Sequence, residues 1–93
     1  MSQIPSLGRI VHYRLSAGDV AEIDRMSPQR DADGRYLRNP AREGDVYPAQ
    51  VTAVFGTGGT ANLVVQLDGP AQHWATSRQP GDGDGQWFWP PRV

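Results

Sequence analysis

Apolar and polar side chains alternate along the run GRIVHYRL, residues 8–15. Val11, Tyr13 and Leu15 occupy every second position, and polar residues lie between them. A period of two residues is typical of a β-strand with one buried face, because successive side chains of a strand point to opposite sides. The pattern therefore predicts a first strand over residues 8–15.

A short helix is predicted directly after this strand. Ser16 is a suitable N-cap, and Asp19, three residues later, completes a weak form of the capping box. Val20 and Ile23 form one apolar stripe, with Met26 as a candidate third member. A helix of about two or three turns is unstable alone, so it depends on packing against the rest of the protein.

Residues 27–44, SPQRDADGRYLRNPAREG, form a long polar connection without a regular pattern. Loops beyond about 12–15 residues are uncommon in compact domains unless they are functional or disordered. Between residues 25 and 42 five Arg stand against two Asp, which makes a local net charge of +3. Two interpretations stay open: a solvated, mobile excursion, which we favour, or an Arg-bearing flap over an anionic ligand.

Four further strands are predicted after this connection. The second strand covers residues 45–55, and its alternation places Val54 on the face opposite to most of its apolar residues. Those apolar residues are Ala49, Val51, Ala53 and Phe55. The remaining strands are predicted over residues 62–68, 72–77 and 86–89, with Gly- and Pro-rich turns between them.

Five short strands with one long early connection are typical of a small β-barrel. We therefore predict a mainly β protein, a five-stranded SH3-like barrel with one short helix and a long loop between strands 1 and 2. The fourth and fifth strands are expected to be hairpin partners, and an OB-like barrel is the alternative fold. The 93 residues fit a single domain, residues 1–93, with the polar loop of residues 27–44 inside it.

The composition agrees with this fold class and limits the chemistry. The chain has 11 Gly and 8 Pro, which favour short strands and turns over long helices. It has no Cys, which excludes disulfides and thiolate-based metal sites or catalysis. No signal peptide and no apolar run of about 18 residues is visible, so we expect a soluble, intracellular protein that does not use a membrane.

The charge is balanced, with 9 positive residues, 10 negative residues and a net charge of −1. Bulk attraction to nucleic acid is therefore not expected. All the positive residues are Arg, which suits bidentate contacts to carboxylate or phosphate groups. A GC-rich genome explains the same residue usage more simply, so the Arg content alone does not identify a ligand.

No motif for catalysis or metal binding stands out. The runs DADG, residues 31–34, and DGDG, residues 82–85, lack the third oxygen ligand of a calcium loop. His12 and His73 are the only imidazoles, and the chain has no G-x-S-x-G or H-E-x-x-H motif. We expect a protein that is not an enzyme and that uses no metal or cofactor.

The aromatic residues are the most informative candidates. Trp87 and Trp89 share one face of the predicted last strand, and Phe88 takes the other. Trp74 lies in the expected partner strand, so a cross-strand contact that builds the core is the interpretation we favour. The other is a stacking platform for a base, an adenine ring or a proline-rich peptide. In that platform the sequence assigns stacking to Trp74, Trp87 and Trp89, phosphate contacts to Arg38, Arg78 and Arg92, and hydrogen-bond donation to Thr76 and Ser77.

Several segments carry a resemblance to known sequences. They are IPSLGRIVHY, DVYPAQV, NLVVQLDG, HWATS and GQWFWPPR, and they cover nearly the whole chain outside residues 16–44. Together they resemble a group of small bacteriophage and prophage proteins with the patterns I-P-x-x-G-R-I-V-H-Y and G-x-W-x-W-P at their two ends. The resemblance implies a phage source and a place in the cytoplasm of the bacterial host. It brings no catalytic residue with it.

From these observations we predict a non-enzymatic, phage-encoded binding protein. Its ligand is expected to be a small anionic, nucleotide-type signal of the host, which it sequesters as an anti-defence protein. The alternative is a protein-interaction or virion-associated accessory barrel that binds a host or phage protein. Binding of single-stranded nucleic acid is a further alternative, against which the balanced charge counts. A homo-oligomer with a pocket between its copies fits the first hypothesis.

Overall fold

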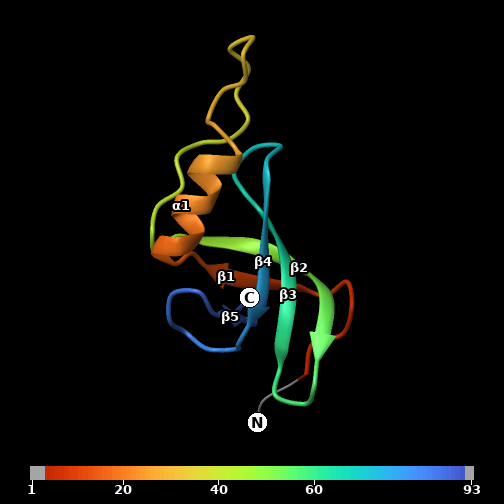
Figure 1. The fold of residues 1–93 in the computed structure, drawn as a ribbon. Helices are drawn as coiled ribbons and strands as arrows, with labels where there is room; N and C mark the ends of the chain where they lie inside the picture. Colours follow the sequence, from red (N-terminus) through yellow and green to blue (C-terminus); the bar gives the residue numbers. More distant parts are fainter. Residues whose placement is uncertain (1–3, 92–93) are drawn as a thin grey trace.

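The computed structural model describes residues 4–91 as a sheet with one helix and one long excursion (Figure 1). In chain order the elements are β1 (Ile10–Arg14), α1 (Ala17–Met26), β2 (Val46–Phe55), β3 (Thr60–Gln66), β4 (Gln72–Arg78) and β5 (Trp87–Phe88). The helix and all five strands predicted from the alternation are present, with bounds that differ by a few residues. Within the described part of the chain, no helix is long and apolar enough to cross a membrane.

The five strands form one antiparallel sheet with the order β4-β3-β2-β1-β5. The predicted hairpin between the fourth and fifth strands is therefore wrong, because β4 and β5 lie at opposite ends of this order. β5 instead pairs with β1, through Phe88 opposite His12 and Trp87 opposite Tyr13. Pro80, which follows β4, forms an isolated bridge with Trp87 of β5, but β4 and β5 do not pair as strands. Over residues 4–91 the sheet is therefore not closed. The fold is thus mainly β with one short helix, and a closed barrel is not confirmed.

The start of α1 confirms the predicted capping box. The Ser16 hydroxyl accepts a hydrogen bond from the Asp19 backbone N–H at 3.1 Å, and the Asp19 carboxylate accepts one from the Ser16 backbone N–H at 2.8 Å. Ile23 is buried and Val20 packs against the core, but Met26 is exposed. The apolar stripe therefore ends before the last turn of the helix, and α1 packs against β4.

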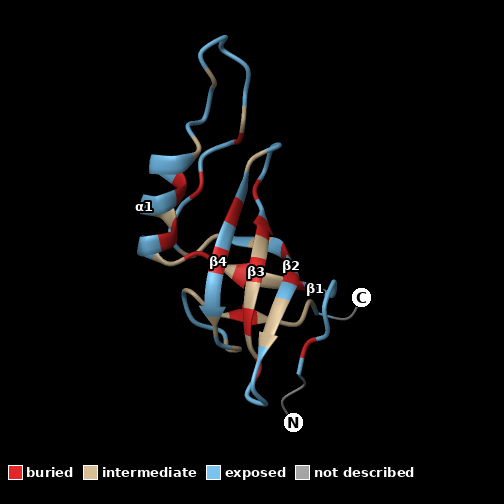
Figure 2. Ribbon diagram, turned by 45° about the vertical axis from the view of Figure 1, so that its right-hand side comes forward, coloured by how far each residue is buried: buried red, intermediate tan, exposed pale blue. Residues whose placement is uncertain are grey.

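The core lies on one face of the sheet, which we call the inner face; the opposite face is the outer face. Figure 2 shows buried residues along the strands and on one side of α1. The strands contribute Val11, Tyr13, Ala49, Val51, Ala61, Leu63, Val65, Ala75 and Trp87, and α1 contributes Ile23. The residues between them, on the outer face, are exposed or half-buried. The alternation seen in the sequence thus separates a covered face from an uncovered one.

A β-bulge reverses this alternation near the end of β2. Val51 pairs with Leu63, and Ala53 pairs with the adjacent residue Asn62. β2 therefore holds one extra residue, Thr52, between these two pairs. An extra residue turns every following side chain to the other face. Val54 consequently packs against the core while Phe55 is exposed, so the predicted faces of the last three residues of β2 are wrong.

Residues 27–44 project from the sheet as a long excursion (Figure 1). An isolated bridge between Arg30 and Tyr36 closes its tip, and the Arg30 guanidinium lies 3.9 Å from the centroid of the Tyr36 ring. The base of the excursion is held by Arg38, which is 2% exposed. The Arg38 side chain donates to the Ser27 carbonyl oxygen at 2.7 Å and to the Asp24 carboxylate at 2.8 Å. Arg38 therefore anchors the excursion to the end of α1.

Candidate functional site

The indole of Trp87 is part of the core. Its ring is 1% exposed, and Nε1 donates a hydrogen bond to the Gly59 carbonyl oxygen at 2.9 Å. Trp89 is half-buried and meets Trp87 edge to face, with 5.4 Å between the ring centroids. The Trp89 ring also meets Arg9, whose guanidinium lies 4.9 Å from the ring centroid. These contacts make Trp87 a structural residue that packs against the turn between β2 and β3.

The arginines assigned to phosphate binding make internal ion pairs. Arg38 pairs with Asp24, as described above, and Arg78 donates to the Asp19 carboxylate at 2.9 Å. Arg92 lies outside the described residues. Arg38 and Trp87 are buried, and Trp74 lies on the outer face, so the structure does not bring the predicted ligand residues into one site.

A second β-bulge explains where Arg78 points. Ala75 pairs with Leu63, but Arg78 pairs with Ala61, so two residues of β4 oppose the single residue Asn62. Ser77 occupies this bulge with a left-handed φ of 55°, and its N–H donates to the Asn62 side-chain oxygen at 2.8 Å. The extra residue turns Arg78 to the inner face. Without it, Arg78 would lie on the same face as Trp74.

Asp19 is the centre of a buried polar network between α1 and the sheet. Its carboxylate accepts hydrogen bonds from the Tyr13 hydroxyl at 2.5 Å, from His73 Nε2 at 2.9 Å and from Arg78 at 2.9 Å. Burial acts to raise the pKa of Asp19, but the hydrogen bonds from His73 and Tyr13 and from the helix cap outweigh it. The pKa is therefore held well below its usual range, and the carboxylate is ionised.

The same network raises the pKa of the Tyr13 hydroxyl. Burial is the main cause, and the hydrogen bond to the Asp19 carboxylate adds to it. Within the described residues, the hydroxyls of Tyr13 and Ser16 are bonded to Asp19 and not to His73. The network therefore holds no hydroxyl against a histidine base, and its evident effect is to hold α1 against the sheet.

The outer face carries a row of side chains from four strands. Trp74 of β4 lies opposite Val64 of β3, Val64 lies opposite Gln50 of β2, and Gln50 lies opposite Ile10 of β1. Trp74 is 62% exposed, and Ile10 is also exposed. The sequence contained a signal for this row, since Ile10 and Val64 are apolar at positions that the alternation assigns to solvent. Alternation alone does not place these four residues in one row, because it does not give the order of the strands in the sheet.

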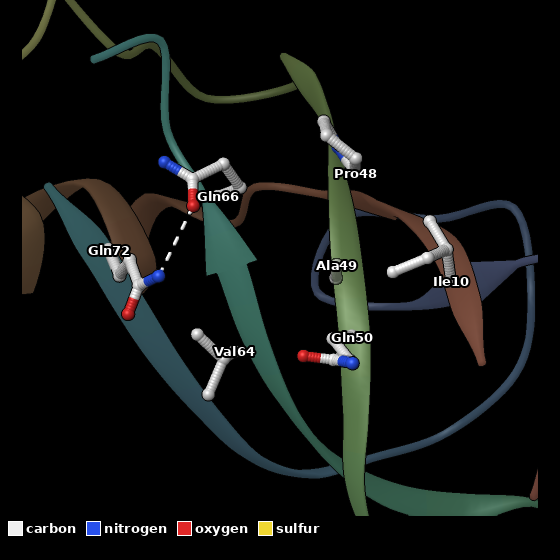
Figure 3. A pocket seen from close by; sticks show the side chains of 7 residues that line it. All are labelled: Ile10, Pro48, Ala49, Gln50, Val64, Gln66 and Gln72. Atoms are coloured by element: carbon white, nitrogen blue, oxygen red, sulfur yellow. Dashed lines mark hydrogen bonds between the residues drawn. The ribbon is translucent and has the colours of Figure 1, made fainter. Parts of the chain in front are cut away.

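A groove of about 400 Å³ follows this row, and we call it the outer groove. Its lining consists of Ile10, Pro48, Ala49, Gln50, Val64, Gln66 and Gln72 (Figure 3). None of these side chains is charged. The Gln72 side-chain N–H donates to the Gln66 side-chain oxygen at 3.2 Å, and Gln66 in turn donates to the Gly69 carbonyl oxygen at 2.8 Å. The outer groove is therefore apolar, with amide groups held in place at one side.

Two of the predicted ligand residues lie on this face of the sheet. Trp74 is next to Val64, which lines the outer groove, and Thr76 follows two positions later on β4. Ser77 is in the bulge and uses its N–H to bond to Asn62. The described residues hold no group of three or more His, Cys, Asp or Glu side chains that could bind a metal ion. The outer groove with Trp74 is thus the best candidate for a binding surface.

Comparisons with protein families, with curated proteins and with solved structures find no match to this chain.

Proposed function

We propose that this protein is a non-enzymatic protein-interaction module. Its outer face binds an uncharged, apolar segment of another protein across the outer groove and Trp74. The observation that carries the proposal is the combination of a groove with no charged lining residue and a tryptophan that is 62% exposed beside it. Exposed tryptophans beside an apolar surface are typical of the few residues that dominate protein interfaces.

The chemistry of the outer groove supports a protein segment as its ligand. Ile10 and Val64 are apolar, while the Gln50 and Gln72 amides provide hydrogen-bonding groups of the kind that pair with a peptide backbone. An anionic ligand would find no positive side chain in the lining. Sequestration of a nucleotide therefore stays a prediction that the described contacts do not support, and so does the binding of single-stranded nucleic acid. A phage source and a host or phage partner also stay predictions.

We also propose that the sheet is the framework of an SH3-like barrel. In support, β1 lies between β2 and β5, and β2, β3 and β4 follow one another as antiparallel neighbours. The long connection is also the one between β1 and β2. Among residues 4–91 no helix or strand covers the outer face, so the fold presents the outer groove rather than enclosing it.

Selection from a displayed library of random dodecapeptides tests the proposed function. We expect binders whose dissociation constants weaken at least tenfold in the Trp74→Ala variant, because truncating a central interface tryptophan costs about 2 kcal/mol or more. Tyr36→Ala is the matched control, since Tyr36 is also an exposed aromatic residue but lies on the excursion. Binders that are insensitive to Trp74→Ala, or a selection without binders, would contradict the proposal.

A further inference from the structure

A second groove, of about 280 Å³, lies between α1 and β4, the strand at one edge of the sheet. We call it the edge groove. Its lining consists of Glu22, Ile23, Met26, Ser27, Gln72, His73 and Trp74. Gln72 also lines the outer groove, so the two grooves are neighbours. Unlike the outer groove, the edge groove contains titratable side chains.

The hydrogen bond between His73 and Asp19 determines which ring nitrogen carries the proton. Asp19 receives a guanidinium from Arg78 and a hydroxyl from Tyr13, so its carboxylate is ionised and can only accept. His73 Nε2 lies 2.9 Å from this carboxylate and must therefore be the protonated nitrogen. In the neutral ring, Nδ1 is then a hydrogen-bond acceptor.

The acceptor nitrogen of His73 lies beside a second acceptor. Nδ1 is 3.9 Å from Glu22 Oε2, and the His73 side chain is only 4% exposed. No residue of the described chain donates a hydrogen bond to Nδ1. The other Glu22 oxygen, Oε1, accepts from Arg25 at 3.2 Å, in an exposed pair that contributes little stability. Two acceptors that face each other in a groove are complementary to a ligand with several N–H donors.

We propose that the edge groove binds a primary ammonium group, of the kind that a lysine side chain carries. One ammonium nitrogen has three N–H donors and can reach both His73 Nδ1 and Glu22 Oε2. The apolar Ile23 and Met26 side chains line the path of its alkyl chain. Trp74 lines the same groove, and its ring attracts cations. A lysine ammonium group must come from another molecule, because the chain has no Lys.

Of the two carboxylates that face His73, Glu22 has the more exposed cationic partner. From α1 the ring faces Asp19 and Glu22, and from β4 Arg78 neutralises Asp19. Tyr13 of β1 is neutral and bonds to Asp19. Glu22 is then shared only with the exposed Arg25. The existence of the ammonium site rests on these contacts alone, whereas its assignment to a lysine of a protein partner rests on the proposed function.

The protonation of His73 is the first test. A long-range ¹⁵N–¹H spectrum of the protein is expected to show the ring proton on Nε2 and a lone pair on Nδ1. A doubly protonated ring would overturn the proposal, because Nδ1 would then donate to Glu22 itself and the site would already be filled. A ring protonated on Nδ1 alone would overturn it as well.

Binding of a defined probe is the second test. Nα-acetyl-lysine methylamide is expected to shift the signals of the Trp74 indole and of His73, and its Nε-acetylated form is not. Glu22→Gln should weaken the binding at least about tenfold, because hydrogen bonds to charged groups contribute about 1.5–3 kcal/mol. Glu43→Gln is the matched control, since Glu43 is exposed on the excursion. Equal binding by both forms of the probe, or by the Glu22→Gln variant, would overturn the proposal.

The source of the ammonium group is tested with putrescine as a competing probe. We expect the lysine derivative to bind more tightly, because its backbone amides reach the Gln72 side of the groove. Equal or tighter binding of putrescine would retain the ammonium site and overturn its assignment to a peptide lysine. The proposed function fails separately: peptides whose binding depends on Trp74 would still bind the outer groove even if no lysine derivative shifted the His73 signals.

Discussion

Trp87 lies on the inner face of the sheet and Trp74 on the outer face, and the two residues have opposite surroundings. Trp87 is 1% exposed, and its indole N–H is bonded to Gly59. Trp74 is 62% exposed, and no hydrogen bond to its indole is formed within residues 4–91. A buried indole with a partner stabilises the fold, whereas an exposed indole adds little stability. The comparison separates the tryptophan that the fold needs from the one that is available to a ligand.

The largest expected effect is on stability at the inner face. Trp87→Ala should lower the free energy of unfolding by about 3–5 kcal/mol, because it removes a buried ring and leaves a cavity. Trp74→Ala should change it by less than about 0.5 kcal/mol, as surface substitutions usually do. Urea unfolding followed by circular dichroism measures both values. A loss of similar size in the two variants would contradict the assignment of Trp74 to an uncovered face.

The next effect concerns Asp19, which joins α1 to the inner face. Asp19→Asn should lower the free energy of unfolding by about 2–3 kcal/mol near neutral pH. This loss is smaller than the loss expected for a fully buried ion pair, because the Arg78 side chain is partly exposed. The pKa of Asp19 is lower in the folded protein than in the unfolded chain. Its contribution is therefore present above the unfolded pKa of about 3.9 and is lost as the pH falls below it.

Urea unfolding over a range of acidic pH values measures this dependence. The wild-type protein should lose stability as the pH falls from about 5, and the Asp19→Asn variant should lose less over the same range. Asp33→Asn is a suitable control, because Asp33 is exposed on the excursion. Parallel pH profiles for the wild-type protein and the Asp19→Asn variant would show that the carboxylate is not held by the network.

A smaller effect than that of Asp19→Asn is expected at the bulge that sends Arg78 to the inner face. Ser77 has a left-handed φ of 55°, which glycine adopts without the steric cost that other residues incur. Ser77→Gly should therefore raise the free energy of unfolding by about 0.5–1 kcal/mol, after the greater chain entropy of glycine is subtracted. Thermal unfolding measures the change. Destabilisation by Ser77→Gly, with Thr76→Gly as the control, would contradict a left-handed residue in the bulge.

The sequence allowed the elements to be predicted but not their neighbours. Alternation located the strands, and the Ser16–Asp19 spacing predicted the helix cap, because both signals are local. The two bulges opposite Asn62 were not predicted, since residues 53–55 are all apolar and residues 76–78 are all polar, so the alternation shows no shift there. They moved Phe55 to the outside and Arg78 to the inside.

The site was predicted less well than the fold for the same reason. Asp19, His73 and Arg78 meet only after the sheet has formed, and His73 lies 54 positions from Asp19 in the chain. The pairing of β5 with β1 likewise separates Trp87 from Trp74 and places them on different faces. Of the predicted aromatic cluster, Trp87 and Trp89 therefore meet against the core, whereas Trp74 lies on the outer face.

The most direct test is a chemical-shift map of the ¹⁵N-labelled protein bound to a peptide selected from the dodecapeptide library. We expect the largest shifts at Trp74, Val64, Gln50 and Ile10, the row that crosses the outer face. The Trp87 indole signal should remain close to its position in the free protein, because its partner is Gly59. Shifts that are largest at Trp87 and Trp89, with the outer row unchanged, would contradict the outer face as the binding surface.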